Sequence, residues 1–278
     1  MTNDRFIMAG GCALRVRESG EGSPTVVLIH GYLESLDVWE DFQKNLSHHL
    51  RVVSLDLPGH GISEVKGEVH SMEFMADTVH AALETLGVGK TVITGHSMGG
   101  YVALEYLRKY PESVSGIALF HSGPNADSEE KRADREREIS LILGGKKELI
   151  ARMFPQVGFA PGNRKRLAGK IEELADQITL TEDEGIIAAL RGMAERRDSN
   201  EVLRLSKVPQ LVIFGRHDEY ISPGTAEAAA KEHPQAHVAW LENSGHMGFV
   251  EEPDKSLEIM LDFLKTLPPE EKSASATL

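Results

Sequence analysis

Short, continuous runs of hydrophobic residues recur along the chain, and glycine or proline follows most of them. The runs are Val26–Ile29, Arg51–Leu55, Thr91–Thr94, Gly116–Phe120 and Leu211–Phe214, and a further short run is Ala239–Leu241. Hydrophobic runs of this length are typical of strands that are buried on both faces, as in a parallel sheet. We therefore expect these segments to form the parallel strands of one central sheet.

Hydrophobic residues at helical spacing lie between these runs. One such set is Met75, Val79, Ala82, Leu83 and Leu86, and another is Leu257, Met260, Leu261 and Leu264. Alternating strands and helices predict the α/β class, with a mostly parallel sheet flanked by helices and a site beyond the carboxyl ends of the strands. Arg5–Arg17, with Gly10-Gly11 between two short runs, predicts a hairpin before the first parallel strand.

The alternation is interrupted between residues 123 and 207, where the pattern is helical and no convincing strand occurs. Val208-Pro209 then precede the next predicted strand. We therefore predict a core formed by residues 1–122 and 208–278, and an inserted, all-helical cap formed by residues 123–207.

Two local patterns fall within this predicted cap. Thr181, with Glu184 three residues later, predicts a capping box at the start of a helix. Residues 129–138 are all charged except Ala133, and we expect them to form a solvated helix face.

The strongest chemical signal is a G-x-S-x-G motif that directly follows a predicted strand. It reads Gly95-His96-Ser97-Met98-Gly99 and continues into a helical stretch. This strand–turn–helix context is that of a nucleophile elbow, a turn so sharp that only glycine fits on either side of the serine. We therefore predict Ser97 as the catalytic nucleophile.

A serine hydroxyl is a weak nucleophile unless a general base activates it, and an acid must orient that base. Asp218 lies in the turn after one late strand, and His246 lies in the glycine-flanked loop after the next. The chain order Ser97, Asp218, His246 is one of three orders that serine enzymes use for these three residues. We predict His246 as the base and Asp218 as the acid.

Other residues compete for the same roles. Glu219 adjoins Asp218, and Asp127 follows an earlier strand, so both are alternative acids. Of twelve histidines, only His246 lies in a glycine-flanked loop after the last strand. His121 follows a strand end as well, and we predict that it lines the substrate pocket.

Two backbone N–H groups are predicted to stabilise the oxyanion. The Met98 amide begins a helix, where partial positive charge accumulates. Gly31 lets the chain turn over the sheet, so that the Tyr32 amide can act as the second donor. Hydrophobic residues of the predicted cap are candidates for an acyl pocket: Met153, Phe154, Phe159 and Met193.

The composition of the 278-residue chain excludes several other classes. With 30 Lys and Arg against 43 Asp and Glu, the net charge of −13 argues against a nucleic-acid partner and against adsorption to anionic membranes. Cys12 is the only cysteine, so neither an intramolecular disulfide nor a cysteine-based zinc site is expected. Met1–Gly11 resembles no secretory signal, and no hydrophobic run is long enough to span a membrane. We expect a cytoplasmic protein.

At these residues the chain resembles the α/β-hydrolase superfamily. The motifs that carry the resemblance are His30-Gly31, Asp56-Leu-Pro-Gly-His60-Gly-Ile-Ser63, Gly95–Gly100, Asp218 and Gly245-His246, all in family order. The resemblance implies the α/β-hydrolase fold with the insertion as a lid, and a structural role for the Asp56 turn. It implies no metal and no organic cofactor.

The residues of the elbow narrow the range of reactions that the resemblance implies. Epoxide hydrolases and haloalkane dehalogenases of this superfamily carry aspartate where this chain has Ser97, and proline iminopeptidases usually carry a tryptophan in the elbow that is absent here. The chain is most similar to small bacterial carboxylesterases, lactonases, cofactor-free perhydrolases and C–C bond hydrolases. This implies a serine hydrolase acting on a small or medium ester or lactone. The alternatives are C–C hydrolysis of a diketone-type substrate, perhydrolysis, or ligand reception with a retained triad; the pattern leaves the natural substrate and the oligomeric state open.

Overall fold

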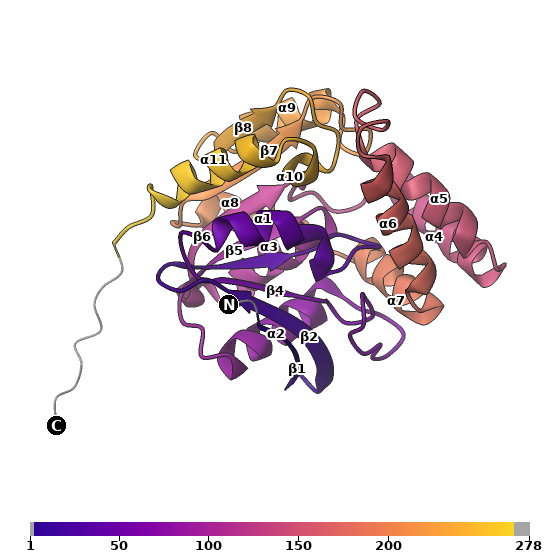
Figure 1. Cartoon of the computed structure of the whole chain (residues 1–278), viewed down its shortest axis with the longest axis horizontal. Helices are drawn as coiled ribbons and strands as arrows, with labels where there is room; N and C mark the ends of the chain where they lie inside the picture. The colour runs from indigo at the N-terminus through magenta and orange to yellow at the C-terminus, as the bar shows by residue number, and fades with distance from the viewer. Residues whose placement is uncertain (1–2, 270–278) are drawn as a thin grey trace.

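The computed structural model describes residues 3–269, and its centre is one eight-stranded sheet (Figure 1). The strand order is β1-β2-β4-β3-β5-β6-β7-β8. The strands are β1 (Asn3–Ala9), β2 (Cys12–Ser19), β3 (Thr25–Ile29), β4 (Val52–Leu55), β5 (Thr91–His96), β6 (Val114–Phe120), β7 (Gln210–Gly215) and β8 (His237–Leu241). Strands β1 and β2 form the predicted antiparallel hairpin, and β3 to β8 pair in parallel. The predicted mostly parallel sheet is confirmed.

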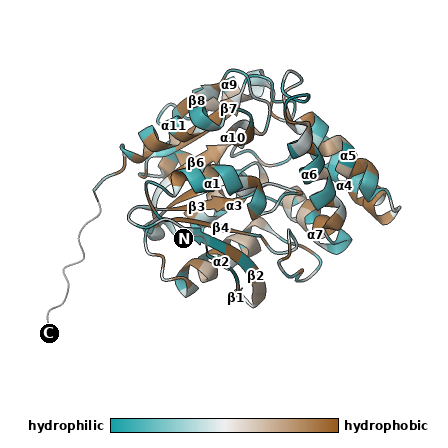
Figure 2. Ribbon diagram, viewed as in Figure 1, coloured by the Kyte–Doolittle hydropathy of each residue, from teal (hydrophilic) through white to brown (hydrophobic). Residues whose placement is uncertain are grey.

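Helices flank this sheet as the hydrophobic spacing predicts. They are α1 (Glu40–Leu46), α2 (Met72–Thr85), α3 (Met98–Lys109), α9 (Pro223–Glu232), α10 (Gly248–Glu251) and α11 (Pro253–Leu264), with short 3₁₀ turns η1 (Leu36–Trp39) and η2 (Pro111–Ser113). Helix α1 packs against α10 and α11, and α2 packs against α3. Figure 2 shows hydrophobic residues concentrated on the central strands, and β5 and β7 are buried along their whole length. No helix within residues 3–269 is long and hydrophobic enough to cross a bilayer.

Five helices lie between β6 and β7, and we call them the helical insertion. They are α4 (Glu129–Leu143), α5 (Lys147–Gly158), α6 (Ala168–Leu180), α7 (Asp183–Ala194) and α8 (Asn200–Leu205). Helix α4 pairs with α7, α5 pairs with α6, and α8 packs against α3. Figure 1 shows α4 to α7 gathered beside the sheet. Residues 1–2 and 270–278 of the predicted core lie outside the described residues.

Two local predictions for the insertion need correction. Thr181 is the C-cap of α6 and its hydroxyl donates to the Gln177 carbonyl, while α7 has Glu182 as an N-cap without a side-chain bond. The predicted capping box is therefore wrong, because Thr181 ends one helix instead of starting the next. The charged run does form α4, but Arg135 in it is only 7% exposed and pairs with Asp127.

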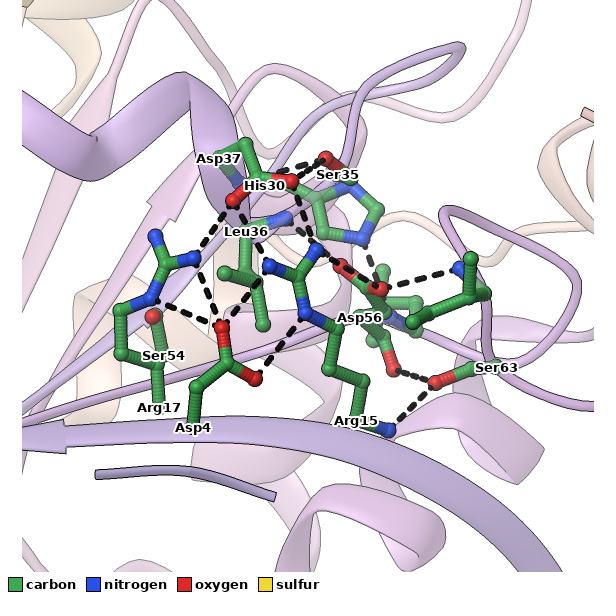
Figure 3. A network of polar contacts seen from close by, with 12 residues as sticks. Asp4, Arg15, Arg17, His30, Ser35, Leu36, Asp37, Ser54, Asp56 and Ser63 are labelled. Carbon is green, nitrogen blue, oxygen red and sulfur yellow. Dashed lines mark hydrogen bonds and ion pairs between the residues drawn. The ribbon is translucent and has the colours of Figure 1, made fainter. Parts of the chain in front are cut away.

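A network of charged residues fixes the N-terminal hairpin to the loop after β3 (Figure 3). Arg15 and Arg17 project from β2, and each hydrogen-bonds both Asp4 and Asp37. Bidentate arginine–carboxylate contacts of this kind fix geometry as well as charge. The start of η1, which contains Asp37, is thereby held against the sheet.

The turn after β4 is organised by the buried carboxylate of Asp56 (Figure 3). Its oxygens accept the N–H groups of Leu36 and Ile62 at 2.8 and 3.1 Å. Burial raises the pKa of Asp56, against the opposing effect of these hydrogen bonds. A side chain at Gly61 would collide with the Asp56 carboxylate, and the φ of Gly61 is +55°. This turn therefore positions the loop of residues 30–36, which lies beside the site described next.

Candidate active site

Ser97 occupies a strained backbone conformation between β5 and α3. Its φ of 49° and ψ of −116° are unusual for a residue with a side chain. Three hydrogen bonds hold this geometry. The Ser97 N–H donates to the Phe120 carbonyl at 2.9 Å, and the Ser97 carbonyl accepts from the Gly100 N–H and the Ser122 hydroxyl at 2.9 and 2.8 Å.

The glycines around Ser97 are required because the turn packs too closely against neighbouring backbone atoms to leave space for a Cβ. A Cβ at Gly95 would collide with the Gly99 carbonyl, and a Cβ at Gly99 would collide with the carbonyls of Ile29 and His30 at the end of β3. The elbow is therefore packed directly against the strand that leads into the loop of residues 30–36.

His246 and Asp218 form a buried pair. His246 Nδ1 lies 2.8 Å from Asp218 Oδ2, and each residue is 4% exposed. The other oxygen of Asp218 accepts the N–H groups of Tyr220 and Ile221 at 2.8 and 2.9 Å. Burial alone would raise the pKa of Asp218, but the two histidines bonded to it, His246 and His121, outweigh burial and hold that pKa well below its usual range. The carboxylate is thus ionised and keeps a proton on His246 Nδ1, which leaves Nε2 to accept one.

His121 lies behind Asp218 and is completely buried. Its Nε2 accepts the Gly248 N–H at 3.1 Å, so its proton sits on Nδ1, which is 3.3 Å from Asp218 Oδ2. Burial lowers the pKa of His121 to about 4, against the attraction of Asp218. Where the sequence predicts a pocket-lining residue, the structure places a neutral histidine that hydrogen-bonds the Asp218 carboxylate.

The three side chains of His121, Asp218 and His246 bring ligand-type atoms within 4.8 Å of one another. A metal ion needs an unprotonated nitrogen. The Gly248 N–H, however, fixes a proton on the His121 nitrogen that faces Asp218. The donor set fits a hydrogen-bonded acid better than a metal ligand set.

His96 joins three segments of the site. Its Nδ1 lies 2.9 Å from Glu34 Oε2, and its Nε2 lies 2.9 Å from the carbonyl oxygen of His246. Both partners are acceptors, so both ring nitrogens carry protons. Burial opposes this charge, but Glu34 outweighs burial and raises the pKa of His96; the pKa of Glu34 is lowered in turn. The sequence pattern predicts no functional role for His96 or Glu34.

This buried pair predicts a pH-dependent stability. The pKa of His96 is raised above its ordinary value of about 6.5, so the stabilisation is complete below that pH and is lost as pH rises through the folded-state value. We expect the difference in unfolding free energy between wild type and Glu34→Gln to be largest near pH 6 and to shrink toward pH 9. Urea unfolding across this range measures it, and a difference that is constant or grows with pH contradicts the ion pair.

The candidate oxyanion donors lie beside the elbow. The Gly31 N–H is occupied, because it donates to Glu34 Oε2 at 2.6 Å, and the Tyr32 amide follows it. The Met98 amide is the first of α3, where an N–H has no intrahelical partner. The Tyr32 hydroxyl donates to Glu138 of α4 at 2.8 Å, so the helical insertion contacts this loop. Glu138 belongs to the charged run that sequence reasoning assigned to solvent.

Aromatic rings lead from this loop to His246. The Tyr32 and Phe154 rings meet edge to face with their centroids 5.8 Å apart. The centroids of the Phe154 and Tyr220 rings are 5.4 Å apart. The centroids of the Tyr220 and His246 rings are 5.0 Å apart. Phe154 is thus one predicted pocket residue that the structure places near His246, the predicted base. Sequence reasoning missed Tyr220, although its position two residues after Asp218 was a usable signal.

The other predicted pocket residues are dispersed. Met153 is 57% exposed on α5, and Met193 is buried in α7. Phe159 is buried and lines a cleft of about 830 Å³ between α6 and α1. Met247 and Phe249 also line this cleft, so it reaches the residues that directly follow His246.

The rival acids occupy other positions. Glu219 is bonded to Arg164 at 2.6 Å on the surface. Asp127 lies in a buried cluster with Arg135 and Arg196. Among residues 3–269, the carboxylate that His246 contacts is that of Asp218.

Comparison with known proteins identifies the family of this fold. The family model described as alpha/beta hydrolase fold matches residues 24–253. The chain belongs to this family. The predicted fold class and superfamily are thereby confirmed.

The relatives of this α/β hydrolase include proteins named for acyl and ester chemistry. It is 31% identical over 265 residues to the dihydrolipoyllysine-residue acetyltransferase component of the acetoin cleaving system of Pseudomonas putida, covering 92% of this chain and 68% of that protein. It is 29% identical to a monoacylglycerol lipase of Xenopus laevis, covering 88% and 76%. The structure of a thermophilic esterase from Thermogutta terrifontis superimposes with a TM-score of 0.89 at 30% identity, covering 95% and 98%.

Proposed function

We propose that this α/β hydrolase is a serine hydrolase that cleaves a small or medium carboxylic ester or lactone. The observation that carries the proposal is the buried His246–Asp218 pair at 2.8 Å, joined through His96 to the strained elbow that presents Ser97. An ionised acid, a histidine fixed in one tautomer and a serine on a sharp turn are the parts that acyl transfer requires. The esterase and lipase names of two relatives support the substrate class.

In the proposed reaction Ser97 Oγ attacks the ester carbonyl carbon while His246 Nε2 takes the hydroxyl proton. The amides of Met98 and Tyr32 stabilise the negative charge on the carbonyl oxygen. The imidazolium then protonates the leaving alcohol, and an acyl group remains on Ser97. Water, activated by His246, releases the acid and restores the serine. Asp218 stays ionised throughout and fixes the His246 tautomer.

We propose that residues 123–207 act as the cap over this site, chiefly through α4 to α7. Two contacts support the idea: Glu138 of α4 bonds the Tyr32 hydroxyl, and Phe154 of α5 packs on Tyr32. Both contacts reach the residue whose amide is the proposed oxyanion donor. The Tyr32, Phe154 and Tyr220 rings then form an aromatic wall beside His246, which favours an uncharged, hydrophobic acyl group.

A series of p-nitrophenyl esters from acetyl to dodecanoyl tests the proposed activity. We expect catalytic turnover with an optimum among short to medium acyl chains, because the aromatic wall limits the space beside His246. Absence of turnover on every ester by folded protein contradicts the esterase proposal and favours the C–C hydrolase or receptor alternatives. Release of a single equivalent of p-nitrophenol without turnover separates the receptor from the C–C hydrolase.

A further inference from the structure

Glu251 is a buried carboxylate outside the proposed triad, and its side chain makes four hydrogen bonds. It is 3% exposed and ends the short helix α10. One oxygen, Oε1, accepts the N–H groups of Gly245 and Met247 at 2.8 and 3.2 Å. These two amides lie on either side of His246, so Glu251 holds the backbone of the catalytic loop from both sides.

The other oxygen of Glu251 holds the helical insertion. Oε2 accepts the Ala160 N–H at 2.8 Å and the Asn163 side-chain amide at 2.7 Å. Both donors lie in the connection between α5 and α6. One carboxylate therefore divides its two oxygens between the loop of residues 245–247 and the segment of residues 158–163.

Direct backbone contact completes this junction. The His246 N–H donates to the Gly158 carbonyl at 2.7 Å, and the His246 carbonyl accepts from His96. At Gly245 a Cβ would lie 2.6 Å from the Ala160 nitrogen and 2.8 Å from the Gly158 carbonyl oxygen, so the two segments touch without space for a side chain. Every backbone polar group of His246 is thus held by a partner, and one of these partners belongs to the insertion.

We propose that Glu251 is a positioning residue through which the connection between α5 and α6 sets the position of His246. The inference rests on the proposed function, because it takes His246 as the general base. His246 reaches the substrate only if its backbone is placed correctly, and a displacement of about 1 Å in such a group costs about 10²-fold in rate. The junction also fixes the connection between α5 and α6. If the insertion opens, the chain must therefore bend at another segment.

The adjacent residue Glu252 provides a matched control. Its carboxylate accepts the Asn243 N–H at 2.9 Å and the Ser244 hydroxyl at 2.6 Å, so it binds the residues that directly precede the loop of residues 245–247. Within residues 3–269, however, its side chain makes no hydrogen bond to the insertion. Glu251 and Glu252 therefore differ in whether they link the loop to the segment of residues 158–163.

The first test compares Glu251→Gln with Glu252→Gln in ester hydrolysis. A glutamine has one acceptor oxygen and one N–H₂ group, so Glu251→Gln turns a donor toward either the loop or the insertion. We expect kcat per active site to fall about tenfold or more with a smaller change in KM, and Glu252→Gln to stay within about twofold of wild type. Active sites are counted by complete labelling with a fluorophosphonate, so partial unfolding does not lower the value. Equal kcat per site in both variants overturns the positioning role.

Hydrogen exchange gives a second readout that needs no activity. In Glu251→Gln we expect faster amide exchange in peptides covering residues 158–163 and 245–247 together, and in Glu252→Gln faster exchange at residues 243–244 without change at 158–163. If Glu251→Gln speeds exchange in the 245–247 peptide alone, the proposed coupling between residues 245–247 and 158–163 is overturned. If wild type lacks esterase activity, the proposed function fails and the positioning role fails with it, whereas this measurement still decides whether Glu251 joins the two segments.

Discussion

Asp218→Asn is expected to lower kcat for ester hydrolysis by about 10⁴-fold while the protein remains folded. The reason lies in the donors around this side chain. His246 and His121 both direct N–H groups at Oδ2, and the amides of Tyr220 and Ile221 direct theirs at Oδ1. An asparagine must point its N–H₂ group at one of these pairs. The histidine side yields more easily, because the His246 imidazole can change tautomer and a backbone amide cannot.

The wrong tautomer of His246 would carry its proton on Nε2 and could not accept one from Ser97. The loss should therefore appear in kcat, with KM little changed. Glu219→Gln is the matched control, because Glu219 is adjacent in sequence but is bonded to Arg164 at the surface. Steady-state kinetics on one p-nitrophenyl ester, measured for both variants and wild type, decides whether Asp218 is the acid. Activity of Asp218→Asn within tenfold of wild type, or a large loss in Glu219→Gln, shows that the acid has been assigned wrongly.

Gly99→Ala is expected to destabilise the protein by about 3 kcal/mol or more. The added methyl would meet the carbonyl groups of Ile29 and His30, which are backbone atoms of β3 and its loop and cannot rotate away. Relief requires α3 to move away from the sheet. That movement would separate the Met98 amide from the loop that carries Tyr32, so activity should fall together with stability.

Gly169→Ala is the control for this substitution. Gly169 is the second residue of α6, as Gly99 is the second residue of α3, but a Cβ at Gly169 meets nothing within 4 Å. We expect Gly169→Ala to stabilise the protein slightly, by about 0.4–1 kcal/mol, because alanine lowers the conformational entropy of the unfolded chain. Urea unfolding followed by circular dichroism measures both variants. Equal unfolding free energies for Gly99→Ala and wild type contradict the close packing at the elbow.

The elements that the sequence predicts well are those whose cause is local. The run Thr91–Thr94 and the glycines at 95 and 99 specify a buried strand and a sharp turn within ten residues, and β5 and α3 follow. The order of Ser97, Asp218 and His246 required only that each residue follow a strand. The spacing of strands and turns therefore carried the prediction of the fold and of the candidate triad.

The supporting contacts could not be predicted because they join residues far apart in the chain. Glu34 and His96 are separated by 62 positions, His121 and Asp218 by 97, and Ala160 and Glu251 by 91. No periodicity relates such pairs, since each depends on how two loops meet at the sheet edge. The charged run of α4 shows the same limit: its composition indicates solvent, yet Arg135 and Glu138 bond inward.

The predicted pocket shows what hydrophobic composition alone cannot resolve. Phe154 and Met153 are neighbours on α5, yet Phe154 packs on Tyr32 while Met153 is 57% exposed. Which face of α5 points toward Tyr32 depends on the pairing of α5 with α6, and that pairing is a tertiary contact. Substrate specificity is therefore the part of the function that the sequence predicts least.

Hydrolysis of the p-nitrophenyl ester series by wild type and by Ser97→Ala, measured side by side, tests most directly whether Ser97 is the nucleophile. We predict turnover by wild type and a fall in kcat of at least about 10⁴-fold in Ser97→Ala, because no acyl-enzyme can form without the hydroxyl. The variant should remain folded by circular dichroism. Turnover by Ser97→Ala close to that of wild type would contradict the assignment and require another nucleophile.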